Sequence, residues 1–151
     1  MGGGDIAESA LAKKMRMRSG SRALILNAPE GYRRGLEPLP KDVELLEQLR
    51  GKFDWIQLFV RTQAELEALA PKAMAALSAE SMLWISFPKG SSKIQTDLTR
   101  DVGWSSLVDV DLKWVNLTSV NLISVNSTWS AFALRTYKPS EPRQKLPWVG
   151  R

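Results

Sequence analysis

Three runs of apolar residues, each about as long as a β-strand, dominate the pattern along this chain. They span residues 23–26, 53–60 and 81–87. Runs that are apolar at nearly every position, rather than at alternate ones, are typical of strands covered on both faces. The pattern therefore predicts three buried strands, the first followed by a turn at residues 27–31, where Pro29 and Gly31 stand.

Helical spacing follows two of these runs. Residues 62–65, Thr-Gln-Ala-Glu, have the spacing of a capping box, and leucines and alanines then recur every three or four positions up to Leu77. Pro71 removes one backbone donor, so we expect a kink or break in this helix near residues 69 and 70. A second helix is expected to begin at Thr96 or Asp97 and to end near residue 108.

The remaining segments are less regular. Residues 42–49 fit a short helix capped by Asp42 or a strand built on Val43 and Leu45, and both remain open. Residues 115–125 and 128–136 predict an antiparallel hairpin turning at Asn126-Ser127. A five-residue repeat crosses the first arm of this hairpin and sends equivalent residues to opposite faces, so we expect a bulge or bend between residues 115 and 125.

Strands that alternate with helices indicate parallel strands joined by right-handed crossovers. The expected architecture is an α/β fold with a mostly parallel sheet and a C-terminal antiparallel hairpin. Residues 19–138 would form this single domain, preceded by a basic helix within residues 1–18 (from Asp5 to Arg18) and followed by a loose, basic tail at residues 139–151.

Composition removes several classes of chemistry. The 151 residues include no cysteine and no histidine. Disulfides, thiolate nucleophiles, imidazole acid and base catalysis and most zinc sites are therefore excluded. No apolar run approaches the roughly 20 residues that a membrane span needs, and the N-terminus lacks the order of a secretory signal. We expect a cytoplasmic protein with no membrane partner.

The formal charge of +5 comes from the two ends of the chain. Residues 1–34 hold seven basic and three acidic groups, and residues 135–151 hold five and one, whereas the middle of the chain has an acidic excess. Basic ends can attract nucleic acid without sequence specificity, or they can act as solubilising segments. The charge distribution thus indicates nucleic-acid binding only weakly.

Several short segments carry a resemblance. They are Leu11-Ala12-Lys13-Lys14, Leu26-Asn27-Ala28-Pro29, Leu58-Phe59-Val60-Arg61, Trp84 to Lys93, Thr96 to Trp104 and Trp129-Ser130-Ala131. Across roughly residues 7–137 the chain resembles an uncharacterised family of short bacterial α/β proteins, a domain of unknown function. The resemblance implies a Rossmann-like three-layer sandwich similar to a shortened S-adenosylmethionine methyltransferase. It implies no established activity.

The turn after the first strand bears on whether S-adenosylmethionine binds. Methyltransferases normally have a glycine-rich turn there, because the backbone must approach the cofactor closely. This chain has Asn27-Ala28-Pro29-Glu30-Gly31, with a proline and one late glycine. Glu44 or Glu47 could be the acid that holds a ribose. We therefore expect no cofactor and keep a reduced methyltransferase as an alternative.

The carboxyl ends of parallel strands meet at one edge of a sheet, which is where open α/β folds bind ligands. The loop at residues 89–93 combines two cations, two hydroxyl groups and a glycine, a set suited to a phosphate or carboxylate. The sequence thus predicts a domain that binds an anionic small molecule or a protein partner, with no catalytic residue and no metal ligand. The candidate ligand-binding residues are Asn27, Glu30, Arg61, Lys89, Ser91, Ser92, Lys93, Asp97 and Arg100.

Overall fold

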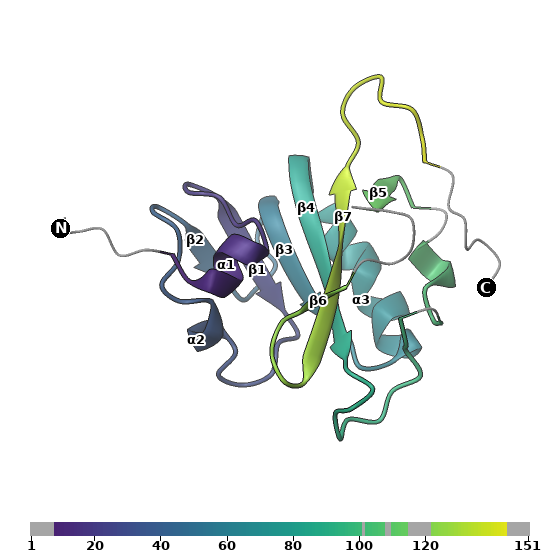
Figure 1. Cartoon of the computed structure of the whole chain (residues 1–151). Helices are drawn as coiled ribbons and strands as arrows, with labels where there is room; N and C mark the ends of the chain where they lie inside the picture. The colour runs from purple at the N-terminus through teal and green to yellow at the C-terminus, as the bar shows by residue number, and fades with distance from the viewer. Residues whose placement is uncertain (1–7, 101, 108–109, 115–121, 145–151) are drawn as a thin grey trace.

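A single mixed β-sheet runs through the computed structural model, which describes residues 8–100, 102–107, 110–114 and 122–144 (Figure 1). The strand order is β2-β1-β3-β4-β7-β5, and β6 pairs with β7. The parallel strands are β1 (Arg22–Leu26), β2 (Glu44–Leu46), β3 (Phe53–Phe59) and β4 (Leu77–Pro88). The antiparallel strands are β5 (Leu112–Trp114), β6 (Ile123–Ser124) and β7 (Trp129–Thr136), which also joins the two halves by pairing with β4.

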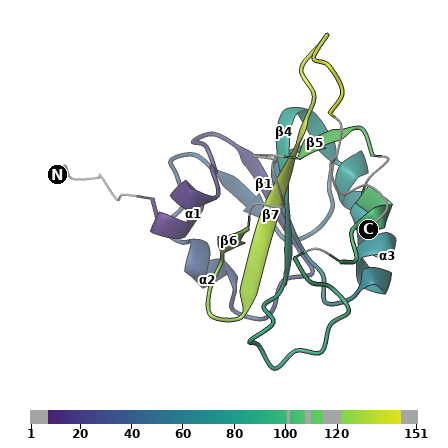
Figure 2. The same ribbon diagram turned by 45° about the vertical axis from the view of Figure 1, so that its right-hand side comes forward.

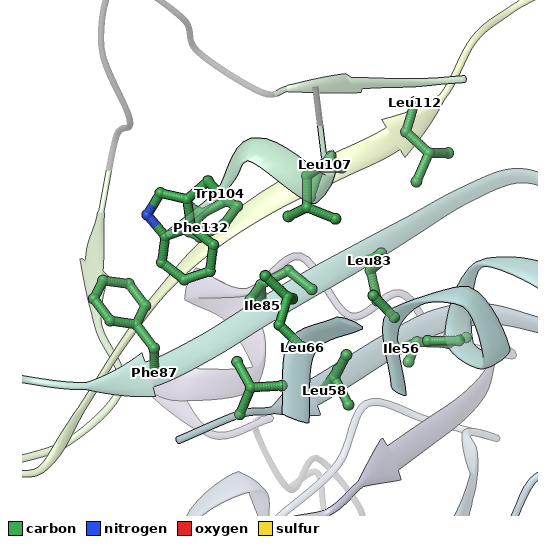
Figure 3. Packing of buried hydrophobic residues seen from close by; sticks show 14 of the residues in the cluster. Ile56, Leu58, Leu66, Leu83, Ile85, Phe87, Trp104, Leu107, Leu112 and Phe132 are labelled. Atoms are coloured by element: carbon green, nitrogen blue, oxygen red, sulfur yellow. The ribbon is translucent and has the colours of Figure 1, made fainter. Parts of the chain in front are cut away.

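Helices cover both faces of this sheet, which gives three layers. The longest helix, α3 (Gln63–Ala75), lies on one face, and α1 (Ala10–Lys14) and α2 (Arg33–Leu36) lie on the other (Figure 2). Alternate residues of β3 supply the two cores: Ile56 and Leu58 face α3, whereas Trp55 faces α1. On the α3 face, Leu66 packs against strands β3 and β4, and Trp104, Leu107 and Phe132 close one end of the core (Figure 3).

The architecture confirms the fold expected from the sequence. The three apolar runs form β1, β3 and β4, and β3 and β4 are central in the sheet. Residues 44–46, which the pattern left open between helix and strand, form the edge strand β2 paired with β1. A short helix, α2, forms at residues 33–36, where no helix was expected.

The helix expected from residue 96 to residue 108 is wrong. In the described part of that segment the backbone is a loop followed by a 3₁₀ turn at Ser105–Leu107. Leu98 and Trp104 are buried, and the Trp104 indole N–H donates to the Thr99 carbonyl at 2.7 Å. Gly103 adopts a positive φ of 108°. The loop forms because two large side chains six residues apart must reach one core, which helical spacing does not allow.

The break expected near residues 69 and 70 does not occur, because α3 is continuous from Gln63 to Ala75 across Pro71. Pro71 is exposed while Leu66, Ala70 and Ala73 are buried, so packing on the opposite face holds the helix together at the position that lacks a donor. The N-terminal helix is also shorter than the expected residues 5–18, because the described part is helical only at Ala10–Lys14, and residues 1–7 lie outside it.

The C-terminal hairpin is confirmed where the structure describes it. Ile123 and Ser124 of β6 pair with Ala131 and Ser130 of β7. The side chain of Asn126 accepts from the backbone N–H groups of Thr128 and Trp129 at 2.9 and 3.0 Å, which closes the turn at the expected place. The expected bulge between residues 115 and 125 falls largely on residues 115–121, outside the described residues.

The C-terminal end of α1 is attached to the sheet by an unusual acceptor. The backbone carbonyl of Met15 accepts from the indole N–H of Trp55 in β3 and of Trp84 in β4, each at 2.9 Å. All three residues are buried. Next to them, the hydroxyl of Tyr32 donates to Gln57 Oε1 at 2.7 Å, and Gln57 Nε2 donates to Ser86 Oγ at 2.9 Å. This face of the sheet thus buries several polar groups, and each of those named here has a hydrogen-bond partner.

We expect the two indole donors to be coupled. Trp55→Phe and Trp84→Phe each leave one donor on the Met15 carbonyl, whereas the double variant leaves a buried acceptor unsatisfied, which costs about 1–3 kcal/mol. Urea unfolding of the wild type, both single variants and the double variant should therefore show a loss in the double variant that exceeds the sum of the single losses. Additive losses within about 0.5 kcal/mol would contradict this coupling.

Asp97 should stabilise α3 from a distance in sequence, because its Oδ1 accepts from the backbone N–H of Gln63 in the first turn, at 2.8 Å. Asp97→Ala is expected to lower the free energy of unfolding by about 1 kcal/mol. Asp97→Asn keeps an acceptor oxygen and should cost less. The control is Glu67→Ala at an exposed position of α3, and a loss in Asp97→Ala no larger than in this control would refute the capping role.

Candidate functional site

Two adjoining grooves lie at the edge of the sheet where β1, β3 and β4 end. The Arg61 groove, of about 530 Å³, is lined by the turn after β1, by Arg61 after β3 and by the turn between β6 and β7. The Lys89 groove, of about 620 Å³, is lined by Thr62, Lys89, Gly90 and residues 94–99. Ile94 lines both grooves and separates them. The carboxyl edge of the parallel strands is therefore hollowed, as expected for an α/β sheet.

Arg61 carries the positive charge of its groove. Its backbone N–H donates to Glu65 Oε1 at 2.6 Å, which holds the Glu65 carboxylate at the start of α3. The guanidinium lies 3.7 Å from Glu65 Oε2 and over the ring of Trp129, with 5.8 Å between Cζ and the ring centroid. Its side chain remains 38% exposed. The guanidinium is therefore held in place while part of it still faces the groove.

The other ionisable groups of this groove are Glu30 and Tyr32. Glu30 is exposed and makes no ion pair with any residue that the structure describes. Tyr32 is buried, and burial raises the pKa of its phenol well above the ordinary value despite the hydrogen bond to Gln57. At neutral pH the Tyr32 hydroxyl therefore keeps its proton, donates a hydrogen bond to Gln57 and does not act as a base.

Lys89 is anchored at the mouth of the second groove. Its backbone N–H donates to the Thr128 carbonyl at 2.8 Å, and its ammonium donates to Ser124 Oγ at 2.7 Å. Asp97 lines the same groove, and Gln63 Nε2 donates to its backbone oxygen at 3.2 Å in addition to the bond at Oδ1. Asp97 was expected to start a helix of its own; it instead caps α3.

The other candidate residues line neither groove. Asn27 has a positive φ of 61°, and its Nδ2 donates to the Phe59 carbonyl at 2.8 Å, so it joins the ends of β1 and β3. Ser92 Oγ accepts from the Ile94 backbone N–H at 3.4 Å within the loop. Ser91, Lys93 and Arg100 are exposed. The structure thus brings together Glu30 with Arg61, and Lys89 with Asp97, but not the whole loop.

Sequence reasoning missed the contribution of the last hairpin. Asn126, Thr128 and Trp129 line the Arg61 groove together with residues from the first strand turn. Because β7 is antiparallel to β4, it begins at the edge where the parallel strands end. The predicted hairpin therefore already contained the signal that its turn would lie at the site.

The described part of the chain contains no group of three or more acidic, histidine or cysteine residues that could hold a metal ion. Asp101, four positions after Asp97, lies outside the described residues. Among the helices described, none combines the length and the apolar character that crossing a bilayer requires.

S-adenosylmethionine binding usually uses an acidic residue after the second strand and a glycine-rich turn after the first. Glu47 directly follows β2, where a ribose-binding acid is expected, but its carboxylate lies 4.0 Å from Arg33 Nη1 and outside the groove lining. Glu44, the other candidate, pairs with Arg22 at 3.1 Å. The Asn27 side chain, at the start of the turn after β1, donates to the Phe59 carbonyl at the end of β3, and α2 after the turn has only four residues. These residues do not fit the usual mode of cofactor binding.

Comparisons with known proteins agree with this geometry at the level of the fold. No model of a protein family matches the chain, and no curated protein matches it. Among solved structures, a putative methyltransferase from Pseudomonas syringae matches with a TM-score of 0.53 at 13% identity, covering 83% of this chain and 94% of the other. A complex of DhpI with SAH matches with a TM-score of 0.54 at 11% identity, covering 84% and 82%.

TrmN from Thermus thermophilus also matches, with a TM-score of 0.54 at 11% identity, although this chain spans only 47% of it. The likeness to TrmN covers 85% of this chain. At such low identities the likeness concerns the backbone arrangement and not the side chains of the site. The chain therefore has a methyltransferase-like Rossmann fold.

Proposed function

We propose that this protein binds a small anionic molecule in the Arg61 groove. The observation that carries the proposal is the Arg61 side chain, which lines the groove just after a central strand and remains 38% exposed. Its nearest carboxylate, Glu65, already accepts the Arg61 backbone N–H, and the side chains are separated by 3.7 Å. A guanidinium so loosely paired can still form the short, paired hydrogen bonds that carboxylates and phosphates accept.

The rest of the lining supports an organic ligand rather than a bare ion. Leu11, Pro29 and Val125 add apolar surface, and Gly31 and Gly35 expose backbone, with open space where a side chain would stand. Small-molecule sites commonly combine such apolar walls with a few fixed polar groups. Asn126 and Thr128 supply further polar atoms on the opposite wall.

Binding is favoured over catalysis by the groups that face the groove. The chain has no histidine or cysteine, and the ionisable residues of this lining are Glu30, Tyr32 and Arg61. Tyr32 stays protonated because of its burial, and Glu30 is exposed. Among the described residues, no hydrogen bond or ion pair orients the Glu30 carboxylate for acid or base work.

A thermal-shift series tests the proposal. Inorganic phosphate, nucleoside monophosphates and small aromatic carboxylates are added to the wild type, to Arg61→Gln and to Arg34→Gln, whose arginine is exposed on α2 and does not line the groove. A ligand at about 100 times its Kd stabilises the folded state by about 2.7 kcal/mol. We expect a shift in the wild type and in Arg34→Gln and its loss in Arg61→Gln. Equal shifts in both variants would contradict the role of Arg61.

A reduced methyltransferase remains the second candidate because the fold likeness to the DhpI complex covers most of both chains. This candidate predicts that S-adenosylhomocysteine binds at the turn after β1, despite the unusual residues there. Isothermal calorimetry with millimolar S-adenosylhomocysteine measures this directly. The absence of heat at that concentration rejects the methyltransferase and leaves the anion proposal standing.

A further inference from the structure

The Arg61 groove is lined by one cationic and one anionic side chain. Arg61 lies 3.7 Å from Glu65 and keeps 38% of its side chain exposed. Glu30, in the turn after β1, lines the same groove and is exposed as well. Tyr32, the third ionisable residue of the lining, keeps its proton at neutral pH. The charged groups of this lining are therefore one guanidinium and one carboxylate.

The Glu30 carboxylate has no ion pair and no hydrogen bond with any residue that the structure describes. The contrast is Glu141, which accepts from Arg135 in β7 at 2.6 Å and from Lys113 in β5 at 3.0 Å. Those bonds hold down part of the segment that was expected to be a loose tail. Other exposed acids in the described ranges also make no ion pair, but Glu30 is the one among them that lines a groove.

Two carboxylates limit the negative charge that this groove can accept. Glu65 is fixed, because its Oε1 accepts the Arg61 backbone N–H at 2.6 Å and its own N–H donates to Thr62 Oγ1 at 3.1 Å. Its carboxylate offsets part of the Arg61 charge from outside the lining. Glu30, within the lining, repels a second negative charge on a ligand. A single carboxylate therefore suits the groove better than a phosphate dianion, and a positive group on the same ligand would complement Glu30.

The remaining walls suit an apolar side chain. Tyr32 and Trp129 are buried and pack edge-on against Phe59, with ring centroids 4.6 and 5.0 Å apart. No atom stands within 4 Å of the position that a side chain at Gly31 or Gly35 would take. The groove volume of about 530 Å³ is in the range of small-molecule sites. Further apolar surface comes from Leu11, Pro29, Ile94 and Val125.

The wall at the turn between β6 and β7 is held in place by two lysines. Lys14 Nζ donates to the Ser124 carbonyl at 3.0 Å, and Lys89 Nζ donates to Ser124 Oγ at 2.7 Å. Ser124 Oγ in turn donates to the Asn126 carbonyl at 3.2 Å. Neither lysine lines the Arg61 groove, so Arg61 is the cation of the lining that a ligand carboxylate would meet. A wall that is already positioned reduces the ordering cost of binding.

We propose that the Arg61 groove binds an α-amino acid with an apolar side chain. The inference rests on the proposed function, because it assigns the ligand carboxylate to Arg61. The ligand ammonium group pairs with Glu30, and the side chain lies against the apolar walls. An α-amino acid carries these three groups on one carbon atom, so a single groove can contact all of them.

The test uses the full chain and ligands that differ by one group. Leucine and phenylalanine are compared by isothermal calorimetry with isocaproate and hydrocinnamate, their analogues without the amino group. The proteins are the wild type, Glu30→Gln and Arg61→Gln. The matched control is Glu67→Gln, which makes the same charge change at an exposed position of α3 outside the groove lining.

We expect the wild type and Glu67→Gln to bind each amino acid about fivefold more tightly than its analogue, the upper end for a solvent-exposed ion pair. Glu30→Gln should reduce this preference to less than about twofold, because the partner of the ammonium group is lost. Arg61→Gln should abolish the binding of all four ligands, because each carboxylate loses its guanidinium.

The outcomes separate this inference from the anion proposal. Equal affinity for amino acid and analogue in the wild type, or a preference that Glu30→Gln leaves unchanged, overturns the amino-acid assignment; loss of binding in Arg61→Gln then still supports an anion site. Binding that Arg61→Gln leaves unchanged contradicts both. Absence of heat from all four ligands at millimolar concentration, or binding of S-adenosylhomocysteine without either amino acid, also overturns the assignment. If Arg61→Gln does not fold, the ligand pairs in the wild type and Glu30→Gln decide.

Discussion

The shared hydrogen-bond acceptor at Met15 holds the end of α1 to the sheet. Two indoles from neighbouring central strands converge on a single backbone carbonyl, at the point where α1 ends and Arg16 adopts a positive φ of 59°. The short helix α1 has only five residues, too few to be stable alone, so its position depends on this contact and on the Ser9 cap. Leu11 of α1 in turn forms part of the Arg61 groove. The wall of the candidate site therefore depends on the docking of α1.

A second set of contacts links the two sides of the sheet edge. Asp97 reaches from the loop after β4 to the first turn of α3, and Glu65 of α3 reaches back to the backbone at Arg61. Ile94, in the same loop as Asp97, packs against the core on the α1 face of the sheet. In the basic loop at residues 89–93, Lys89 is bonded to Ser124 and Thr128, whereas Ser91 and Lys93 are exposed and line neither groove. The proposed ligand site is therefore centred on Arg61 rather than on this loop.

The fold says less about the function of this protein than the side chains of its candidate site do. The backbone has the arrangement of methyltransferases, and the hollow edge lies where ligands bind in such sheets. At that edge the acid after β2 is paired with Arg33, and Asn27 after β1 donates to the Phe59 carbonyl at the end of β3. The likeness in backbone does not by itself give the ligand, because function belongs to the site and not to the fold.

The amino-acid sequence by itself determined the strands β1, β3 and β4, their burial and the parallel core, because near-continuous apolar runs such as residues 53–60 are typical of strands covered on both faces. It also placed Arg61 and Lys89 at the same edge, since both directly follow strands that prove parallel. Local periodicity could not show that residues 96–104 leave the helical path, because Leu98 and Trp104 are directed by a core built from distant strands. The pairing of Gln144 with Trp114 and of Asp97 with Gln63 joins residues at least thirty positions apart. Only the tertiary structure decides such contacts, since their energy depends on where the rest of the chain has already folded.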